Sequence, residues 1–423
     1  MSQHGPIVVI ANERDGTLAR ALDSAGLSPI IDALWARAPG VVERAVPSAV
    51  IMTEAAAAAA ADQRMMEKIA QAVTSSPLYT PVLARIGIGV LEGMPGALPL
   101  AADASSERIV ARLRAALRVR ALHISVTDQA RLLTGADPAP PDLPEGDPLE
   151  DATVLVTGRG RSYPGLTMAV GERVGAIGAL SVETAASYLN ARDVDGVVIG
   201  EGFGPPTLAA FLTALVEDAR FRDLPVALLP EPPPAIDISP LANLERLAGT
   251  PREVVAGLLP LVRQHALAAR LRRRLASIKA DGLIDSRTGL FTMAGFLADL
   301  TRAIEEAQGR AAGLSLARFS FPPALDRRVS LDAARLISRL VRSIDFGCQT
   351  SDGSILVAFS ATALRHAHVF ARRIASVLRH TTLAPVGDAG GQVDASVTLA
   401  TLKPTDTVES LVARVCEPEV ALV

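Results

Sequence analysis

The sequence predicts an α/β protein in which two doubly wound parallel-sheet domains precede a C-terminal α+β domain. Two successive segments alternate short apolar runs with helical patterns, and a proline-rich stretch separates them. The last third mixes strand and helix patterns without that alternation. At 423 residues the chain is too long for one ordinary core. Aromatic residues are only 3% and alanine is abundant, which favours helix-rich α/β domains over an aromatic-packed β-sandwich.

The first domain is expected over residues 1–130. We predict its strands at Ile7–Ile10, Ala49–Met52, Pro81–Ala84 and Leu98–Leu100, and its helices at Ala55–Val73 and Ser106–Leu122. Residues 131–150 are expected to form a linker. Five prolines and two glycines between Thr134 and Pro148 can neither continue a helix nor join a ladder.

The second domain, residues 151–262, repeats the same order of patterns. Strands are predicted at Val154–Thr157, Ala176–Ala179, Gly196–Ile199 and Val226–Leu229. Helices are predicted at Gly165–Val174, Val182–Asn190 and Thr207–Ala219. The similar length and order indicate two copies of one architecture.

A connecting helix is expected over residues 263–281. Upstream, Thr250, Pro251 and Glu253 carry the pattern of a helix start with a capping box. A run of cations without an acid follows, at Arg263, Arg270, Arg272, Arg273, Arg274 and Lys279. We interpret it as the solvated face of a helix rather than a nucleic-acid patch, because the net charge of the chain is −3. Its apolar stripe could also pair with a second copy of the chain.

The C-terminal domain is expected over residues 282–423. Strands are predicted at Leu314–Phe319, Ser354–Phe359 and Asp394–Ala400. Helices are predicted at Phe296–Gln308, Leu331–Ile344 and Thr362–Arg379. The segment Ser351–Ser354 is typical of a tight turn and predicts a hairpin.

The two cysteines, Cys348 and Cys416, exclude a disulfide framework and suit a reducing cytoplasm. The first apolar run is four residues long, so we expect a strand rather than a signal peptide. No charge-free apolar run reaches about eighteen residues, so no membrane span is expected.

Several motifs of the last third resemble those of GGDEF domains. These are the opening Asp285–Leu290, the helix after the hairpin at Ala361–Ile374, and the closing strand and last helix at Val397–Ala400 and Asp406–Leu411. Two receiver-like domains before a GGDEF domain resemble the layout of PleD-type response regulators. The resemblance implies two flavodoxin-like receiver domains and a GGDEF, nucleotide-cyclase-like domain. Active members of that family condense two GTP molecules into cyclic di-GMP.

The residues that would carry catalysis in that family differ here. Its Gly-Gly-Asp/Glu-Glu-Phe hairpin corresponds to Ser351, Asp352, Gly353, Ser354 and Ile355. The strand Leu316–Phe321 has no acid for a metal, and the following loop, Phe321–Arg328, lacks the usual guanine-reading residues. Phosphoryl transfer depends on metal and positioning. We therefore expect no catalytic residue, no metal, no cofactor and no enzyme activity.

A ligand site is expected to persist beside this hairpin. The resemblance places Arg342 and Asp345 in the family's inhibitory Arg-x-x-Asp site and Arg373 on the later helix, implying cyclic di-GMP as ligand. Guanidinium groups can grip phosphate or the guanine O6/N7 edge, and a carboxylate can accept from guanine N1–H and N2–H. The alternative is a surface ion pair at a helix end, worth little.

Both receiver-like domains lack the usual phosphorylation set. Where an acidic pair would follow the first strand, the first domain has Asn12 and Glu13. The first strand of the second domain ends at Thr157. Glu54 and Glu201 stand one position beyond the expected aspartate, and no lysine occurs between Lys68 and Lys279. We interpret both domains as dimerisation or docking modules for a protein partner that the sequence does not name.

These observations predict a catalytically inactive, cytoplasmic and homodimeric receptor and adaptor for cyclic di-GMP in bacterial second-messenger signalling, without nucleic acid or membrane as partner. Two alternatives stay open at this point, a dimeric scaffold that binds no nucleotide and a residual diguanylate cyclase.

Overall fold

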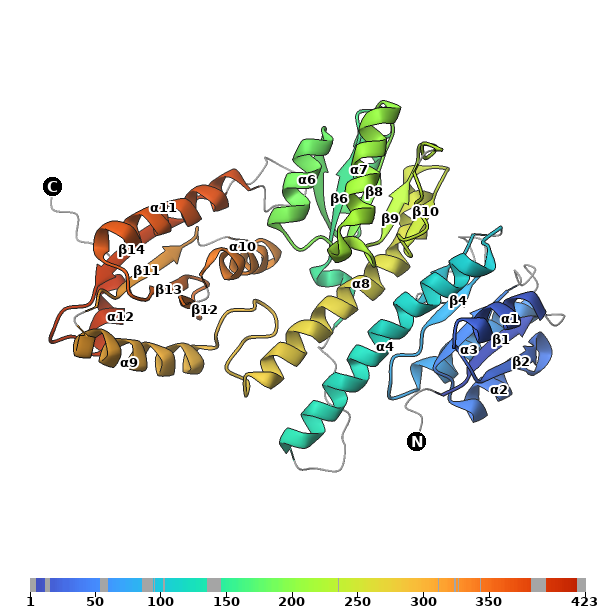
Figure 1. The fold of residues 1–423 in the computed structure, drawn as a ribbon, viewed down its shortest axis with the longest axis horizontal. Coiled ribbons are helices and arrows are strands. Elements are labelled where there is room, and N and C mark those ends of the chain that lie inside the picture. Colours follow the sequence, from blue (N-terminus) through green and yellow to red (C-terminus); the bar gives the residue numbers. More distant parts are fainter. Residues whose placement is uncertain are drawn as a thin grey trace. The chain divides into compact units, whose positions relative to one another are not determined.

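The computed structural model describes residues 5–11, 16–53, 60–85, 94, 96–101, 103–134, 146–234, 236–310, 312–322, 325, 327–342, 344–381 and 393–416. The chain divides into two compact units. One consists of Met1–Leu189 and Val194–Leu271, and the other of Asn190–Asp193 and Arg272–Val423. The first unit holds two α/β modules, here called the first module (residues 5–134) and the second module (146–271). The second unit holds the C-terminal module (272–416) (Figure 1).

The first module is a five-stranded parallel sheet in the order β2-β1-β3-β4-β5. Its elements are β1 Ile7–Ala11, α1 Gly16–Ser24, β2 Ile30–Leu34, η1 Trp35–Arg37, α2 Ala38–Ala45, β3 Ala49–Met52, α3 Ala60–Thr74, β4 Val82–Ala84, β5 Ala97–Pro99 and α4 Ser106–Thr134. Ile7 and Val9 pack with α1 and α4, while Val8 and Ile10 pack with α2 and α3. Helices therefore cover both faces, which is why β1 is apolar throughout.

The second module repeats this topology in the order β10-β9-β8-β6-β7. Its elements are η3 Pro148–Asp151, β6 Thr153–Thr157, α5 Tyr163–Gly171, β7 Gly175–Ala179, α6 Val182–Ala191, β8 Gly196–Ile199, α7 Pro205–Glu217, η4 Ala219–Phe221, β9 Val226–Leu228, β10 Leu244–Arg246 and α8 Pro251–Lys279. Numbered along each module, both sheets have the flavodoxin-like order 2-1-3-4-5. The predicted pair of doubly wound parallel sheets is confirmed, and receiver identity stays a prediction. Most of the predicted linker lies outside the described residues.

Helix α8 differs from the predicted connecting helix. It begins at Pro251 instead of residue 263, with the capping box formed by Thr250 and Glu253. Its first half packs in the second module through Val254, Leu258 and others. The prediction of a solvated basic face is wrong at Arg270, which is buried against the Gly146 and Asp147 carbonyls and Asp151.

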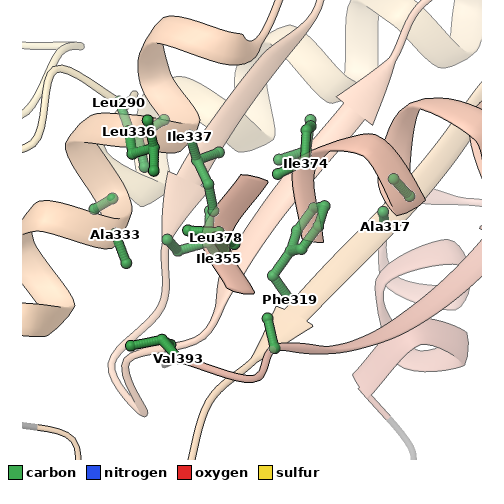
Figure 2. Close-up of a cluster of buried hydrophobic side chains, with 14 of the residues drawn as sticks. Leu290, Ala317, Phe319, Ala333, Leu336, Ile337, Ile355, Ile374, Leu378 and Val393 are labelled. Carbon is green, nitrogen blue, oxygen red and sulfur yellow. The ribbon is translucent and has the colours of Figure 1, made fainter. Parts of the chain in front are cut away.

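The C-terminal module has a four-stranded antiparallel sheet in the order β12-β13-β11-β14. Its elements are α9 Met293–Arg310, β11 Ser315–Ser320, α10 Arg327–Leu340, β12 Phe346–Gln349, β13 Ile355–Phe359, α11 Leu364–His380, β14 Ser396–Thr401 and α12 Val408–Cys416. From β11 on, this is a β-α-β-β-α-β arrangement. Helices α10 and α11 pack on one face around Phe319, Ile337 and Ile374 (Figure 2). Helices α9 and α12 cover the other face.

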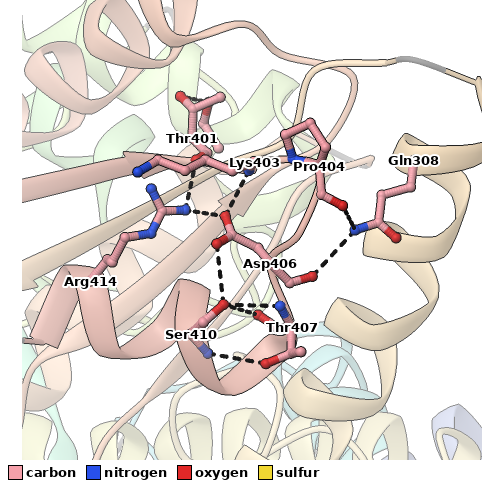
Figure 3. A network of polar contacts seen from close by, with 9 residues as sticks. Gln308, Thr401, Lys403, Pro404, Asp406, Thr407, Ser410 and Arg414 are labelled. Atoms are coloured by element: carbon pink, nitrogen blue, oxygen red, sulfur yellow. Dashed lines mark hydrogen bonds and ion pairs between the residues drawn. The ribbon is translucent and has the colours of Figure 1, made fainter.

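A polar network fastens the loop between β14 and α12. Asp406 accepts hydrogen bonds from the Lys403 backbone amide (2.6 Å) and the Ser410 hydroxyl (3.2 Å), and it pairs with Arg414 (Figure 3). Gln308 of α9 donates to the carbonyls of Pro404 and Asp406, both at 3.3 Å. The loop is thus held against the helix layer that supports the sheet.

Candidate functional site

The three predicted ligand residues meet at one small pocket of about 50 Å³. Arg342 follows α10, Asp345 precedes β12, and Arg373 lies on α11. The residues that line the pocket are Leu340, Val341, Arg342, Asp345, Phe359, Phe370, Arg373 and Ile374. The fold therefore joins an Arg-x-x-Asp pair and an arginine nearly thirty positions later in the sequence.

Asp345 is buried at the base of this site, with its side chain only 1% exposed. Its Oδ2 accepts from Nε of Arg342 at 2.8 Å, and its Oδ1 accepts from the backbone amide of Ser360 at 3.0 Å. The amide of Asp345 in turn donates to the carbonyl of Arg342 at 2.9 Å. The carboxylate therefore links the end of α10 to the end of β13.

Arg342 is fixed from three directions but keeps 42% of its side chain exposed. Besides the bond to Asp345, its Nη2 donates to Oγ1 of Thr362 at 3.0 Å. Its Cζ lies 4.1 Å from the centre of the Phe370 ring, a cation–π contact. The guanidinium is thus held with part of its donor set toward solvent.

The sequence segment that contains the site is rich in arginine. From Arg327 to Arg379 the chain has nine arginines and three acidic residues. Of those three, Asp345 is buried and paired with Arg342. Arg373 is exposed and lines the pocket, whereas the adjacent Arg372 is exposed but does not. The exposed guanidinium groups at the pocket favour an anionic ligand.

The hairpin between β12 and β13 is closed by its own polar side chains. The turn carries Gly353 at a φ of +83°, and Thr350 and Ser354 are joined by a backbone hydrogen bond of 2.9 Å. Asp352 accepts from the hydroxyls of Thr350 and Ser354 and pairs with Arg318 of β11 at 2.6 Å. The single acid of the hairpin is therefore already neutralised by a cation of the chain.

This pairing predicts how the hairpin responds to acid. The pKa of Asp352 lies below its ordinary range, chiefly because the Thr350 hydroxyl donates to it, with further bonds from Ser354 and Arg318. A depressed carboxyl pKa contributes stability above the unfolded-state value and loses it as the pH falls through the folded-state value. We expect the hairpin amide signals in NMR spectra to be unchanged from pH 7 to pH 5. In the Asp352→Asn variant, the stability loss below about pH 4 should be smaller than in wild type. If the two proteins lost the same stability between pH 5 and low pH, this assignment would be contradicted.

The loops that follow β6 and β8 in the second module are joined by backbone hydrogen bonds. The carbonyl of Glu201 accepts from the amides of Arg159 and Gly160 at 2.8 and 2.9 Å. A Cβ at Gly160 would lie 2.7 Å from the Glu201 Cβ, so these loops pack closely. In the first module, Asn12, Glu13 and Glu54 lie outside the described residues.

Neither cysteine forms a disulfide, and Cys348 is buried in the sheet. Burial raises the pKa of its thiol to about 12, consistent with a small core residue. Within the part of the chain that the structure describes, no cluster of three His, Cys, Asp or Glu side chains could hold a metal ion. None of the described helices is long and apolar enough to cross a membrane.

Sequence reasoning did not identify Ser360, Thr362 and Phe370 as parts of the site. Phe370 precedes Arg373 by three positions on α11, which places both on one helix face. That spacing was a usable signal, although an aromatic residue in a helix more often belongs to the core. The contribution of Ser360 is a backbone amide and leaves no trace in the sequence.

No protein-family model matches the sequence, and no curated protein matches it. Solved structures similar to about a third of this chain are GGDEF domains. The coiled coil and GGDEF domain of DgcB from Caulobacter crescentus in complex with c-di-GMP is 20% identical, with a TM-score of 0.30, over 34% of this chain and 83% of that chain. Diguanylate cyclase SiaD from Pseudomonas aeruginosa, in complex with its activator SiaC, is 21% identical, with a TM-score of 0.30, over 33% and 57%. The FimX GGDEF domain from Pseudomonas aeruginosa is 18% identical, with a TM-score of 0.29, over 31% and 88%.

Proposed function

We propose that this protein is a catalytically inactive receptor for cyclic di-GMP that acts as an adaptor in bacterial signalling. The observation that carries the proposal is the convergence of Arg342, Asp345 and Arg373 on one pocket. The resemblance had singled out Arg342 and Asp345 in one segment and Arg373 in another.

The chemistry of the pocket suits a cyclic dinucleotide. Such a ligand offers phosphate anions and the O6 and N7 acceptors of guanine, both of which match the parallel donors of a guanidinium. Arg342 and Arg373 present two such groups at the pocket. Arg342 is already ordered by Asp345, Thr362 and Phe370, so binding loses little side-chain entropy.

The hairpin supports the proposal of inactivity. Metal-assisted phosphoryl transfer needs acids that are free to hold divalent cations. The acid of this hairpin, Asp352, is engaged by Arg318 and two hydroxyls, and β11 itself carries no acid. A divalent cation would have to displace the Arg318 guanidinium to reach the Asp352 carboxylate.

The adaptor role rests on the two α/β modules of the first unit. They are joined by a buried ion pair between Arg112 of α4 and Glu245 of β10. Arg118 of α4 and Asp223 add a second, more exposed pair. Two modules fastened in this way offer a continuous docking body for a protein partner, whose identity a pull-down would supply.

Calorimetry on the full chain tests the ligand. We expect cyclic di-GMP to bind with a micromolar or tighter Kd, which corresponds to about −8 kcal/mol or better. Absence of heat at high ligand concentration would overturn the proposal and favour a scaffold that binds no nucleotide.

Incubation with GTP and either Mg²⁺ or Mn²⁺, followed by chromatography, tests inactivity. We expect no cyclic di-GMP above the level of a control without protein. Any product above that level would contradict the proposal and favour the alternative of a residual diguanylate cyclase.

A further inference from the structure

We propose that the cavity between the two modules of the first unit binds a small aliphatic carboxylate, a ligand with one anionic head group and a hydrocarbon tail. The head group binds Arg108 of α4, and the tail packs on an aliphatic wall contributed by the second module. No residue of the candidate site in the C-terminal module takes part, so this inference goes beyond the proposed binding of cyclic di-GMP.

The cavity lies where strands of both modules end. Its volume is about 820 Å³, within the range of roughly 300–1,000 Å³ that is typical of small-molecule sites. The carboxyl ends of β9 and β10 line one side, and the segment from β5 into the first turns of α4 lines the other. Ligands of open α/β sheets bind outside the carboxyl ends of the strands. The cavity is therefore placed where this fold class accepts a small molecule.

One wall of the cavity is aliphatic. The described residues between β9 and β10 form no helix, and this irregular segment contributes two isoleucines beside the strand ends. The aliphatic residues of the wall are Leu228, Leu229, Ile236, Ile238, Leu244 and Leu247. None of the described lining residues is aromatic. The wall thus suits a hydrocarbon chain rather than a ring that needs a stacking partner.

Arg108 offers the cavity a guanidinium without a carboxylate partner. Its Nη1 donates to the carbonyl of Leu241 at 2.8 Å, and its Nη2 donates to the carbonyl of Leu244. The neighbouring Arg112 pairs with Glu245, and among the described residues no acid forms an ion pair with Arg108. Burial lowers the pKa of Arg108 to about 10, and repulsion from Arg112 adds to this. Two guanidinium groups share one carboxylate here, and a ligand carboxylate supplies the missing negative charge.

The acids that line the cavity restrict the ligand to one charge. Asp103, Glu107 and Asp237 line it at exposed positions. The pKa of Glu107 is lowered by hydrogen bonds from its own backbone amide and from Ser105, and Asp237 accepts from the amide of Ser239 at 2.9 Å. A second anionic group on the ligand would meet either these carboxylates or the aliphatic wall, and both are unfavourable.

Calorimetry with three compounds of one chain length tests the head group on the full chain, with no nucleotide present. We expect octanoate to bind saturably at one site per chain, with a Kd below about 1 mM. 1-Octanol lacks the charge and octanedioate carries a second one, so each should bind at least about tenfold more weakly. Equal affinities for octanoate and 1-octanol, or no saturable binding of octanoate, would overturn the proposal. Neither result bears on cyclic di-GMP.

The Arg108→Gln variant should bind octanoate at least about tenfold more weakly, because charge-assisted hydrogen bonds to the head group are lost. Arg114→Gln is the matched control, since Arg114 lies on the same helix, is exposed and does not line the cavity. Its affinity should stay within about twofold of wild type. A folded Arg108→Gln protein with wild-type affinity would place the head group elsewhere and contradict the assignment.

Filling the cavity gives a second test that keeps the bonds of Arg108, whose removal also takes two donors from carbonyls of the second module. Ala111 of α4 lines the cavity and is partly buried. Ala111→Leu occupies space without removing a hydrogen bond, so octanoate should bind at least about fivefold more weakly while the circular dichroism spectrum stays that of wild type. Wild-type affinity in this folded variant would show that the tail lies outside the cavity.

Discussion

The Arg342→Ala variant should bind cyclic di-GMP at least about 100-fold more weakly than wild type. Charge-assisted hydrogen bonds contribute about 1.5–3 kcal/mol each, and Arg342 offers a fork of donors together with a stacking face. Calorimetry of the full-length proteins measures the effect. Lysine should not restore binding, because an ammonium cannot reproduce the planar fork.

Arg372→Ala is the matched control for this prediction. It removes the same charge from an exposed position of α11 that does not line the pocket. Its affinity should stay within about threefold of wild type, because screening limits long-range effects of surface charge. Thermal unfolding must accompany both variants, since Arg342→Ala leaves Asp345 buried without its closest partner. A folded Arg342→Ala protein with wild-type affinity would place the ligand elsewhere.

The Arg112→Ala variant should lower the free energy of unfolding of the N-terminal unit by about 3–5 kcal/mol. The Arg112 side chain is fully buried and pairs with Glu245, whose side chain is 10% exposed. It also donates to the carbonyls of Ala242 at 3.1 Å and of Pro99. Alanine leaves a buried carboxylate and several carbonyls without their donors and opens a cavity. Denaturant unfolding followed by circular dichroism measures the loss.

Arg118→Ala provides a comparison on the same helix. Arg118 pairs with Asp223 of the second module, but the two side chains are 40% and 26% exposed. An exposed pair contributes about 0–1 kcal/mol, so this variant should be nearly neutral. Comparable losses for the two variants would show that burial does not distinguish these pairs. Arg112→Met, which fills part of the space without a charge, should still be unstable while Glu245 remains.

The central strands of all three modules were predicted, and the edge strands β2, β10 and β12 were not, although the hairpin between β12 and β13 was predicted. Residues Ala49–Met52 and Gly196–Ile199 are buried on both faces and read as apolar runs. In β2 only Ala33 is buried, and β10 has just three residues with Glu245 in the middle. An edge strand is defined by its neighbour in the sheet, so its own residues carry a weak pattern.

The lengths of α4 and α8 also needed the tertiary structure. Both are 29 residues long, and the arginines of α8 were predicted to lie on a solvated face. Arg112 and Arg270 are nevertheless buried, because carboxylates and carbonyls from distant segments meet them. Buried cations are tolerated only when they are paired in this way.

The family resemblance named Arg342, Asp345 and Arg373 as candidate ligand residues, and their role stays a prediction. The sequence by itself determined most of the buried strands, the alternation of strands and helices in the first two modules and the absence of an acid from β11. These features depend on local patterns and motif spacing. Only the tertiary structure decided how the site is built. It brought Arg373 to Arg342, placed Phe370 beneath the guanidinium, and closed Asp345 between Arg342 and the Ser360 amide. The physical reason is that the exposure and hydrogen-bond partners of a side chain are set by segments distant in the sequence, and these decide whether a carboxylate faces a ligand or holds an arginine in place.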